Sequence, residues 1–354
     1  MKQSLRTDLA AGYSISRLLK GGWQLAGGHG AIDPAAAIAD MHAYYDAGIT
    51  AFDCADIYTG VEEMIGAFRR DRIATRGSES VAQLKVHTKF VPDLAVLPNI
   101  DRRLVEQTID RSLTRLGVER LDLVQFHWWD YRVPRYLETA SWLADLQRAG
   151  KIDRLGGTNF DTARTREIVA AGVPLISMQV QYSLIDQRPR AMLAPFCAAA
   201  GMKLLCYGSV AGGFLSERWL GVSEPAQADE TRSLTKYKLI IDDFGGWDLF
   251  QQLLLTLKQI ASRHGVSIPT VAMRWVLEQP EVAAVIVGVR RGDHLPDHLR
   301  VLSLDLDAGD LALLDAVLAQ RRPPSGDVYA EERDLEGRHG RVMKYDLNET
   351  PSGH

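Results

Sequence analysis

Cysteine is scarce in this chain. Its 354 residues include only Cys54, Cys197 and Cys206, an odd number without a paired spacing. That count argues against a disulfide framework and a cysteine-bound metal cluster, so we expect no metal site. The first thirty residues mix charged side chains with short apolar pieces, and no signal-peptide core is expected. These features favour a protein of the reducing cytoplasm.

The chain also lacks an excess of one charge and long apolar segments. It has 41 Lys and Arg against 45 Asp and Glu, a formal net charge of −4, and a pI near 6.2. This balance gives no reason to expect nucleic acid or an acidic membrane as a partner. No apolar run reaches the length that spans a bilayer. We therefore expect a soluble intracellular protein.

A third absence concerns nucleotide binding. An open sheet that binds a dinucleotide usually carries Gly-x-Gly-x-x-Gly after an early strand. Gly27, Gly28 and Gly30 do not have that spacing, and Gly212 and Gly213 follow a late strand. A doubly wound sheet of the Rossmann type is therefore disfavoured.

What the sequence does contain is an alternation of helical patterns and short strands from about residue 34 to 302. Helical patterns stop at a glycine, which supplies the left-handed conformation that ends a helix. These glycines are Gly48, Gly117, Gly150, Gly172, Gly201 and Gly265. Strands are expected at 16–22, 49–53, 84–89, 121–127, 152–157, 175–179, 203–207 and 285–288. Eight strands separated by helices predict an α/β fold, a closed (β/α)8 TIM barrel.

We interpret residues 1–354 as a single barrel domain with its core at about 16–320. Two segments fall outside the alternation. Residues 216–247 form a long insertion after the seventh strand, and we predict a functional loop or lid there. The charged tail, residues 321–354, either covers one end of the barrel or stays mobile.

Polar side chains stand at the ends of successive predicted strands. Asp53 ends the second strand, and Tyr58 follows shortly after it. Lys89 ends the third strand and His127 the fourth. Because alternate residues share a face of a strand, the polar face that holds Asp53 and His127 is predicted to point into the barrel. The carboxyl ends of barrel strands meet at one rim, so we predict a proton-transfer site there.

The chemistry of these side chains suits the reduction of a carbonyl. A phenol has a pKa of about 10 and donates a proton poorly at neutral pH unless its anion is stabilised. An ammonium about 4 Å away stabilises a phenolate by roughly 4 kcal/mol at an effective dielectric of about 20. Lys89 can supply that charge to Tyr58, and Asp53 can orient Lys89. A donor nitrogen of His127 can hold the carbonyl oxygen.

Other interpretations of these residues stay open. A single lysine at a strand end is usually a solvated charge, and a single histidine in a strand is usually structural. Asp53 could cap the turn that follows it, and Tyr58 could pack beneath a loop. A TIM-barrel lyase or hydrolase that uses Lys89 as a Schiff-base nucleophile is a further alternative.

Six motifs, in order along the chain, resemble those of the aldo-keto reductase family. Three carry the catalytic side chains: Phe-Asp-Cys-Ala-Asp-Ile-Tyr at 52–58, His-Thr-Lys at 87–89, and Leu-Asp-Leu-Val-Gln-Phe-His-Trp at 121–128. The others are Leu-Gly-Gly-Thr-Asn-Phe at 155–160, Gln-Val-Gln-Tyr-Ser-Leu at 179–184, and Tyr-Gly-Ser-Val-Ala-Gly-Gly-Phe-Leu at 207–215. The resemblance implies a barrel that binds NADP(H) or NAD(H) without a Rossmann fold.

By this resemblance, Tyr58 would be the general acid, tuned by Lys89 and Asp53. His127 would orient the carbonyl. The residues implied for the nicotinamide end are Gly22, Trp23, Asp53, Thr158, Asn159, Gln179 and Tyr207. Those implied for the pyrophosphate are Gly208, Ser209, Val210 and Gly212, where small residues expose backbone N–H groups. The substrate pocket is implied to draw on Trp23, Tyr58, His127 and Trp128, with the loops 129–134 and 216–247.

The region after the last strand bears on the choice of cofactor. The resemblance places Gly288, Arg290, His294, Asp297 and His298 near the adenosine. A guanidinium can bind a phosphate bidentately, so Arg290 and the neighbouring Arg291 favour NADP(H). If both arginines are solvated charges at a helix start, NAD(H) remains possible.

We therefore predict an NADP(H)-dependent aldo-keto reductase that transfers a hydride between the nicotinamide and an aldehyde or ketone, or the corresponding alcohol. The family also resembles accessory proteins of potassium channels. A cofactor-sensing regulatory subunit with slow turnover is therefore the alternative, and the rate of cofactor release distinguishes the two.

Overall fold

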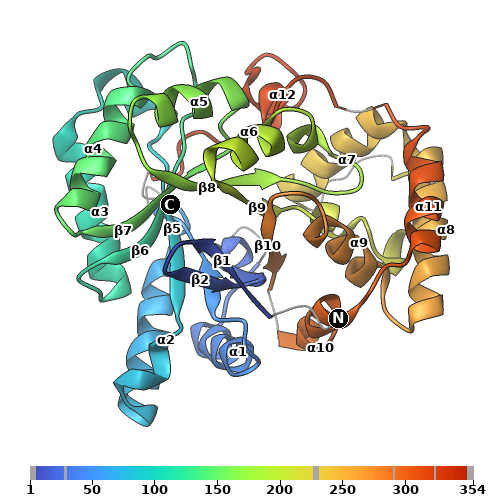
Figure 1. The fold of residues 1–354 in the computed structure, drawn as a ribbon, viewed down its shortest axis with the longest axis horizontal. Coiled ribbons are helices and arrows are strands. Elements are labelled where there is room, and N and C mark those ends of the chain that lie inside the picture. The colour runs from blue at the N-terminus through green and yellow to red at the C-terminus, as the bar shows by residue number, and fades with distance from the viewer. Residues whose placement is uncertain (1–4, 28–29, 226–230, 290–291, 323, 349–354) are drawn as a thin grey trace.

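The computed structural model describes residues 5–27, 30–225, 231–289, 292–322 and 324–348. Eight parallel strands close into a barrel in the order β10-β3-β4-β5-β6-β7-β8-β9, and helices surround it (Figure 1). The strands are β3 (Leu18–Gly21), β4 (Ala51–Asp53), β5 (Lys85–Phe90), β6 (Leu121–Phe126), β7 (Ile152–Thr158), β8 (Leu175–Gln181), β9 (Lys203–Tyr207) and β10 (Val282–Gly288). The predicted (β/α)8 barrel is confirmed, with strand ends that differ from the predicted ones by a few residues.

The helices begin and end where local side chains satisfy the backbone. Asp33 and Asp101 cap α1 and α3 by accepting hydrogen bonds from backbone amides of the first turn. The six glycines predicted to end helical patterns all have positive φ. The helices around the barrel are α1 (Pro34–Asp46), α2 (Val61–Arg76), α3 (Arg102–Leu116), α4 (Tyr136–Arg148), α5 (Thr162–Ala170), α6 (Leu193–Ala200), α8 (Trp247–His264), α9 (Ile268–Leu277), α10 (Leu295–Ser303) and α11 (Ala308–Leu318).

Alternation along the strands separates two apolar layers. Side chains on the outer face pack against the helices and include Phe52, Val124, Phe126 and Met178. Side chains on the inner face fill the barrel and include Leu19, Ala51, Leu123, Leu205 and Ile286. Because residues two apart share a face, Ala51 places Asp53 on the inner side, and Leu123 does the same for Gln125. The apolar filling therefore gives way to polar groups toward the C-terminal ends of the strands.

A hairpin closes the opposite end of the barrel and was missed from the sequence. Strands β1 (Arg6–Ala10) and β2 (Tyr13–Ser16) pair antiparallel around a turn at Gly12. Apolar side chains of the hairpin join the inner cluster. The predicted strand 16–22 is thus split, because Ser16 ends β2 and its hydroxyl accepts from the amides of Thr50 and Ala51. The hairpin could have been predicted from the alternating apolar residues on both sides of Gly12.

The insertion 216–247, expected as a loop, is largely helical. It contains η6 (Glu217–Trp219) and α7 (Arg232–Phe244), and its last residue begins α8. Thr231 caps α7 by accepting from the Leu234 amide. The loop prediction was wrong because an apolar stripe of helical spacing follows the Gly- and Pro-containing part. The stripe consists of Tyr237, Ile240, Ile241 and Phe244.

The described part of the tail, up to residue 348, runs across the C-terminal end of the barrel. It contains α12 (Ala330–Arg333, red in Figure 1) and η8 (Gly340–Val342). Backbone groups of the tail bond to the loop after β5: the Leu94 amide donates to the Tyr345 carbonyl, and Asp93 accepts from the Leu347 amide. Of the two outcomes considered for the tail, the structure shows the one that covers the barrel.

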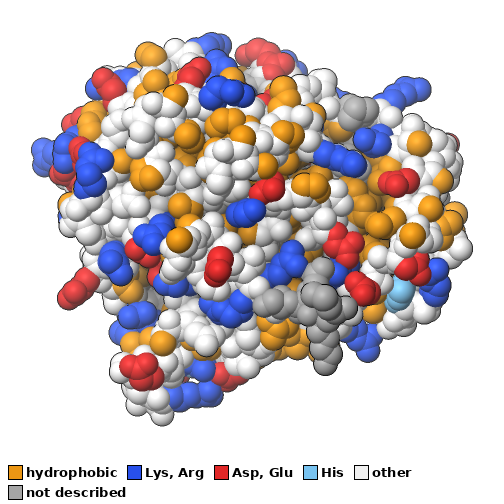
Figure 2. Space-filling model, in the orientation of Figure 1, with side chains coloured by type: hydrophobic (Ala, Val, Ile, Leu, Met, Phe, Trp, Pro, Cys, Tyr) orange, Lys and Arg blue, Asp and Glu red, His pale blue; other side chains and the backbone are white. Residues whose placement is uncertain are grey.

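Two further observations concern the surface and membranes. Positive and negative side chains are interspersed over the face drawn in Figure 2. Among the helices that the structure describes, none has the length and apolar character to cross a membrane.

Candidate active site

The side chains predicted to be catalytic stand at the C-terminal ends of neighbouring strands. Asp53 is the last residue of β4, Lys89 lies near the end of β5, and His127 directly follows β6. The ammonium nitrogen of Lys89 lies 2.8 Å from Asp53 Oδ2 and 3.4 Å from the Tyr58 hydroxyl oxygen. It also donates to the Cys54 carbonyl at 2.8 Å. The structure therefore brings an acid, an amine and a phenol into one hydrogen-bonded group.

Burial and the neighbouring charges shift the pKa values of Tyr58 and Lys89 in opposite directions. Burial raises the pKa of Tyr58, and the Lys89 ammonium offsets only part of that effect. Burial by itself lowers the pKa of Lys89, but the nearby Asp53 carboxylate and Tyr58 outweigh it, so the net pKa is raised. Tyr58 therefore keeps its proton at neutral pH while Lys89 stays charged. The sequence argument gave the ammonium more weight than desolvation, which is the larger effect in the structure.

His127 is fixed by a backbone contact. Its Nδ1 lies 3.0 Å from the Thr158 carbonyl oxygen. A carbonyl oxygen only accepts, so in a neutral ring Nδ1 carries the hydrogen and Nε2 presents a lone pair. Burial, with help from the Arg333 guanidinium, lowers the pKa of His127 to about 3, which keeps the ring neutral. The enclosed Nε2 has no partner among the described residues, and its lone pair can accept from a hydroxyl group. This corrects the expectation that His127 donates a hydrogen bond to the carbonyl oxygen, because the ring hydrogen is used on the Thr158 carbonyl.

A polar network inside the barrel holds Asp53. Its Oδ1 accepts from the amide nitrogens of Gln125 at 3.2 Å and Gln179 at 2.6 Å. Gln179 also donates to Gln125 Oε1 at 3.0 Å. Gln179, predicted to hold the nicotinamide, thus uses its NH₂ group within the barrel. Gln125 was not predicted as a site residue, although it shares a strand face with His127.

Several residues predicted for the nicotinamide end meet at the same rim. The Tyr207 hydroxyl donates to Asn159 Oδ1 at 2.9 Å, and Thr158 directly precedes Asn159 at the end of β7. Trp23 follows Gly22 after β3, and its ring lies 5.1 Å from the Tyr58 ring in an edge-to-face arrangement. Amide, hydroxyl and aromatic groups are a suitable donor set for a carboxamide-bearing ring.

The predicted pyrophosphate turn packs against helix α7. Gly208 and Gly212 both have positive φ, and an added Cβ would lie 2.3 Å and 2.6 Å, respectively, from atoms of the Tyr237 side chain. Ser209 is buried and Val210 partly buried in the same turn. The packing of Tyr237 therefore explains why glycine is needed at both positions. This reason is separate from the pyrophosphate contact that the resemblance implies.

The residues assigned to the adenosine end lie around the start of α10. Arg290 is outside the described residues. Gly288 ends β10, His294 is exposed and Asp297 is half-buried. His298 is buried, and its Nδ1 lies 2.8 Å from the Tyr44 hydroxyl of α1, so one ring nitrogen of His298 is already engaged.

The predicted substrate residue Trp128 faces away from the rim. It is fully buried, its ring packs against Phe126 and Tyr136 of α4, and its indole N–H donates to backbone carbonyls of the following loop. This corrects the prediction, because alternation places Trp128 outward when His127 points inward. The next residue, Trp129, packs edge-on against His127 with ring centroids 4.2 Å apart.

Side chains from the tail complete the rim and were not predicted. The Tyr329 ring lies 5.9 Å from the His127 ring, and the Tyr345 ring lies 5.2 Å from the Trp129 ring. Lys236 of α7 lies over the rings of Tyr207 and Tyr329, at 5.4 Å from each centroid. Sequence spacing could not reveal these contacts, because the tail is about 200 residues from the strands that it covers.

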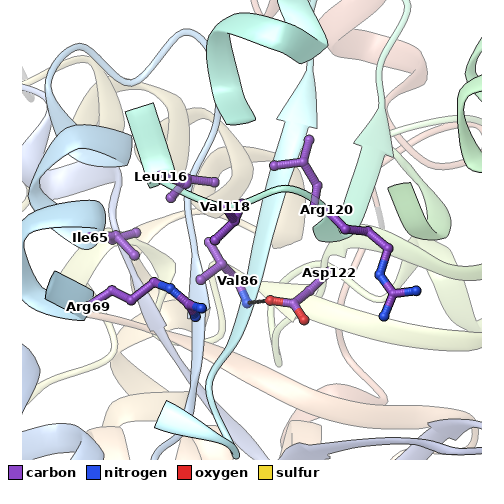
Figure 3. A pocket seen from close by; sticks show the side chains of 8 residues that line it. Ile65, Arg69, Val86, Leu116, Val118, Arg120 and Asp122 are labelled. Carbon is purple, nitrogen blue, oxygen red and sulfur yellow. Dashed lines mark hydrogen bonds between the residues drawn. The ribbon is translucent and has the colours of Figure 1, made fainter. Parts of the chain in front are cut away.

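Two small cavities lie elsewhere. One, of about 10 Å³, is bounded by α2, α3 and the strands β5 and β6, and Figure 3 shows its lining with the Val86 amide bonded to Asp122. It holds about one water molecule and so is too small for a substrate. The other, of about 80 Å³, is lined by Asp56, Asp93 and Asn348 among others. Neither includes any of the four predicted catalytic side chains.

Comparison with known proteins decides the family. A sequence model of the Aldo/keto reductase family matches residues 17–319. The chain belongs to the aldo-keto reductase family. Its match to flagellar radial spoke protein 5 of Chlamydomonas reinhardtii is 31% identical over 63% of this chain and spans only 49% of that protein. The match to an NADH-specific methylglyoxal reductase of Escherichia coli is 24% identical and covers 85% of this chain and 94% of the reductase.

Solved structures confirm the fold of this aldo-keto reductase. The glycerol dehydrogenase AKR11B4 from Gluconobacter oxydans superposes with a TM-score of 0.73 at 24% identity. The superposition covers 89% of this chain and 94% of that one. Family and fold together establish a (β/α)8 barrel of the aldo-keto reductase family. Family membership supports oxidoreductase activity with a nicotinamide cofactor and a small-molecule substrate.

Proposed function

We propose that this aldo-keto reductase uses NADP(H) to interconvert an aldehyde or ketone with the corresponding alcohol, with Tyr58 as the general acid and base. The observation that carries the proposal is the contact of the Lys89 ammonium with both Asp53 and the Tyr58 hydroxyl. A protonated phenol beside a fixed positive charge can release its proton because the resulting phenolate is stabilised in place.

The residues at the rim fit a nicotinamide by the chemistry of their donor set. Asn159, Thr158 and Tyr207 would hold its carboxamide and ring, and the reduced cofactor supplies the hydride when bound. As the carbonyl oxygen gains negative charge, the Tyr58 hydroxyl passes its proton to that oxygen. Lys89 stabilises the phenolate that remains. The lone pair of His127 Nε2 then accepts a hydrogen bond from the new hydroxyl group.

The contacts of Lys89 count against the Schiff-base alternative. A nucleophilic amine must be neutral, and such lysines have a lowered pKa. Here burial lowers the pKa of Lys89, but Asp53 and Tyr58 together outweigh burial and raise it, so the amine stays protonated. The cofactor-sensor alternative differs from the proposed enzyme only in turnover, which the experiments below measure.

The preference for NADP(H) rests on Arg290 and the neighbouring Arg291, because the Asp40 carboxylate beside Gly292 would by itself repel a 2′-phosphate. Asp40 lies so close to Gly292 that an added Cβ would be 2.5 Å from its Oδ1. Titration with NADPH and NADH, followed by quenching of tryptophan fluorescence, should show saturable binding that is tighter for NADPH. Arg290→Ala should weaken NADPH more than NADH, whereas Arg300→Ala, an exposed change on α10, should affect neither. An equal loss for both cofactors would contradict the phosphate assignment.

Removal of the phenolic hydroxyl tests the general acid. Tyr58→Phe should bind cofactor with an unchanged dissociation constant and lose roughly 10²- to 10⁴-fold in carbonyl reduction, the usual contribution of a positioned acid. Tyr13→Phe removes a buried phenol in the hairpin at the opposite end of the barrel and serves as the control. Turnover of Tyr58→Phe at the wild-type rate would refute the proposed role.

A further inference from the structure

Unpartnered hydrogen-bond donors gather beside His127. The indole nitrogen of Trp129 and the Nε and Nη1 atoms of Arg333 are all enclosed, and none has a partner among the described residues. Buried donors are almost always paired in native proteins, so a group without a partner calls for an explanation. Free donors on two residues near the catalytic side chain, Trp129 in direct contact with His127 and Arg333 one ring away, point to a ligand with hydrogen-bond acceptors.

Arg333 is held firmly at this position by the tail and the loop after β6. Its Nη2 donates to the Trp128 carbonyl at 2.9 Å. Its guanidinium carbon lies 4.1 Å from the centroid of the Tyr131 ring and 5.2 Å from that of the Tyr329 ring. Tyr329 in turn contacts the His127 ring. A single aromatic ring therefore separates the guanidinium from the catalytic imidazole.

The charge of Arg333 is not neutralised by an ion pair within the described part of the chain. The adjacent Glu332 turns to Arg188, with Oε2 2.9 Å from Nη1 of that residue. The nearby Asp130 is held by Arg132 through both carboxylate oxygens. The charge of Arg333 also acts on the catalytic side chain, because it contributes, after burial, to the lowered pKa of His127.

The geometry points to an oxyanion subsite formed by Arg333 and the indole N–H of Trp129, which selects carbonyl substrates that carry a carboxylate or phosphate group. This inference deepens the proposed function and rests on it. A guanidinium is the side chain best suited to bind either oxyanion, and an indole N–H adds a donor without charge. The reacting carbonyl would lie toward Tyr58 and the anionic end toward the tail.

Matched substrates test the subsite. The wild-type enzyme should have a kcat/KM for 4-carboxybenzaldehyde at least tenfold above that for its methyl ester, methyl 4-formylbenzoate. In Arg333→Gln this ratio should fall by at least tenfold, mainly through KM, and Arg333→Lys should recover part of it. Arg341→Gln, an exposed change on the same tail, should keep the wild-type ratio. A second pair, glyceraldehyde 3-phosphate and glyceraldehyde, shows whether phosphate or carboxylate gives the larger preference.

Equal losses for the acid and the ester in Arg333→Gln, or a wild-type ratio near one in both pairs, would overturn the subsite and leave Arg333 as an anchor of the tail. Calorimetric titration of the cofactor-bound protein with benzoate separates this from failure of the proposed function. Wild type and Arg341→Gln should bind benzoate, and Arg333→Gln should bind it at least tenfold more weakly. That result supports the subsite even if no aldehyde is reduced, and equal binding by all three proteins contradicts it.

Discussion

Asp53 shows how one side chain organises the candidate site. One carboxylate oxygen accepts from Lys89, and the other accepts from Gln125 and Gln179. Both lone-pair regions of a buried anion are therefore used, which is the condition under which a buried ion pair is tolerated. The ion pair fixes the ammonium that faces the Tyr58 hydroxyl.

We expect Asp53→Asn to lower both stability and turnover. The change leaves the Lys89 ammonium buried without its counter-ion, and breaking a buried pair in this way costs about 3–5 kcal/mol of unfolding free energy. Urea unfolding followed by circular dichroism measures the loss. Asp122→Asn is the matched control, since the Asp122–Lys85 pair on neighbouring strands is partly exposed and of similar length. A loss at Asp53 no larger than that at Asp122 would contradict the argument.

At the scale of elements, a buried charge cluster fastens the tail to the barrel. Arg188, in the loop after β8, binds both Asp186 and Glu332 of α12, and all three are nearly inaccessible to solvent. Lys236 of α7 lies 3.9 Å from Glu332. Burial by itself raises the pKa of Glu332, but Arg188, with a smaller contribution from Lys236, outweighs it, so the net pKa is lowered to about 2. The cluster therefore connects α12 and α7, the two elements that cover the rim, to the loop after β8.

Glu332→Gln should loosen the tail while the barrel remains folded. The substitution removes the negative charge that balances Arg188 and Lys236, so the tail should open more often and expose its backbone. Limited proteolysis with trypsin should cut earlier at the tail arginines than in wild type. Glu336→Gln changes a fully exposed residue of the same tail and should leave the cleavage rate unchanged. Equal rates in all three proteins would show that the cluster does not fasten the tail.

Elements set by local signals could be predicted from the sequence, and those set by distant contacts could not. Glycine stops and strand alternation are local, so the eight strands and the inward direction of Asp53 follow from them. The β1–β2 hairpin depends on packing into the barrel, and α7 was obscured by the Gly- and Pro-containing segment before it. Arg333 and Tyr329 reach the rim only through the fold of the tail, and no spacing in the sequence connects them with His127.

For the molecule as a whole, buried histidines link stability to pH. Burial lowers the pKa of His87 and His127 to about 3 each and that of His298 to about 4. An unfolded histidine has a pKa of about 6.5, so below that pH the unfolded state binds more protons than the folded state. Stability must therefore fall on acidification, by roughly 1.4 kcal/mol per histidine at a pH of about 5.5.

Asp56 has the opposite effect on the pH dependence of stability. Mutation of Asp56 and of a buried histidine can separate the two effects. Burial raises the pKa of Asp56 to about 8, so its folded state binds the extra proton and gains stability as the pH falls from about 8 toward 4. With three histidines against one aspartate, urea midpoints should still decrease between pH 7 and 5.5. The slope of the unfolding free energy against pH reports how many more protons the unfolded state binds. His87→Asn should reduce that number by about one, and Asp56→Asn should increase it by about one. Slopes that change in the same direction, or a midpoint that rises on acidification of the wild type, would contradict the assignment of these buried groups.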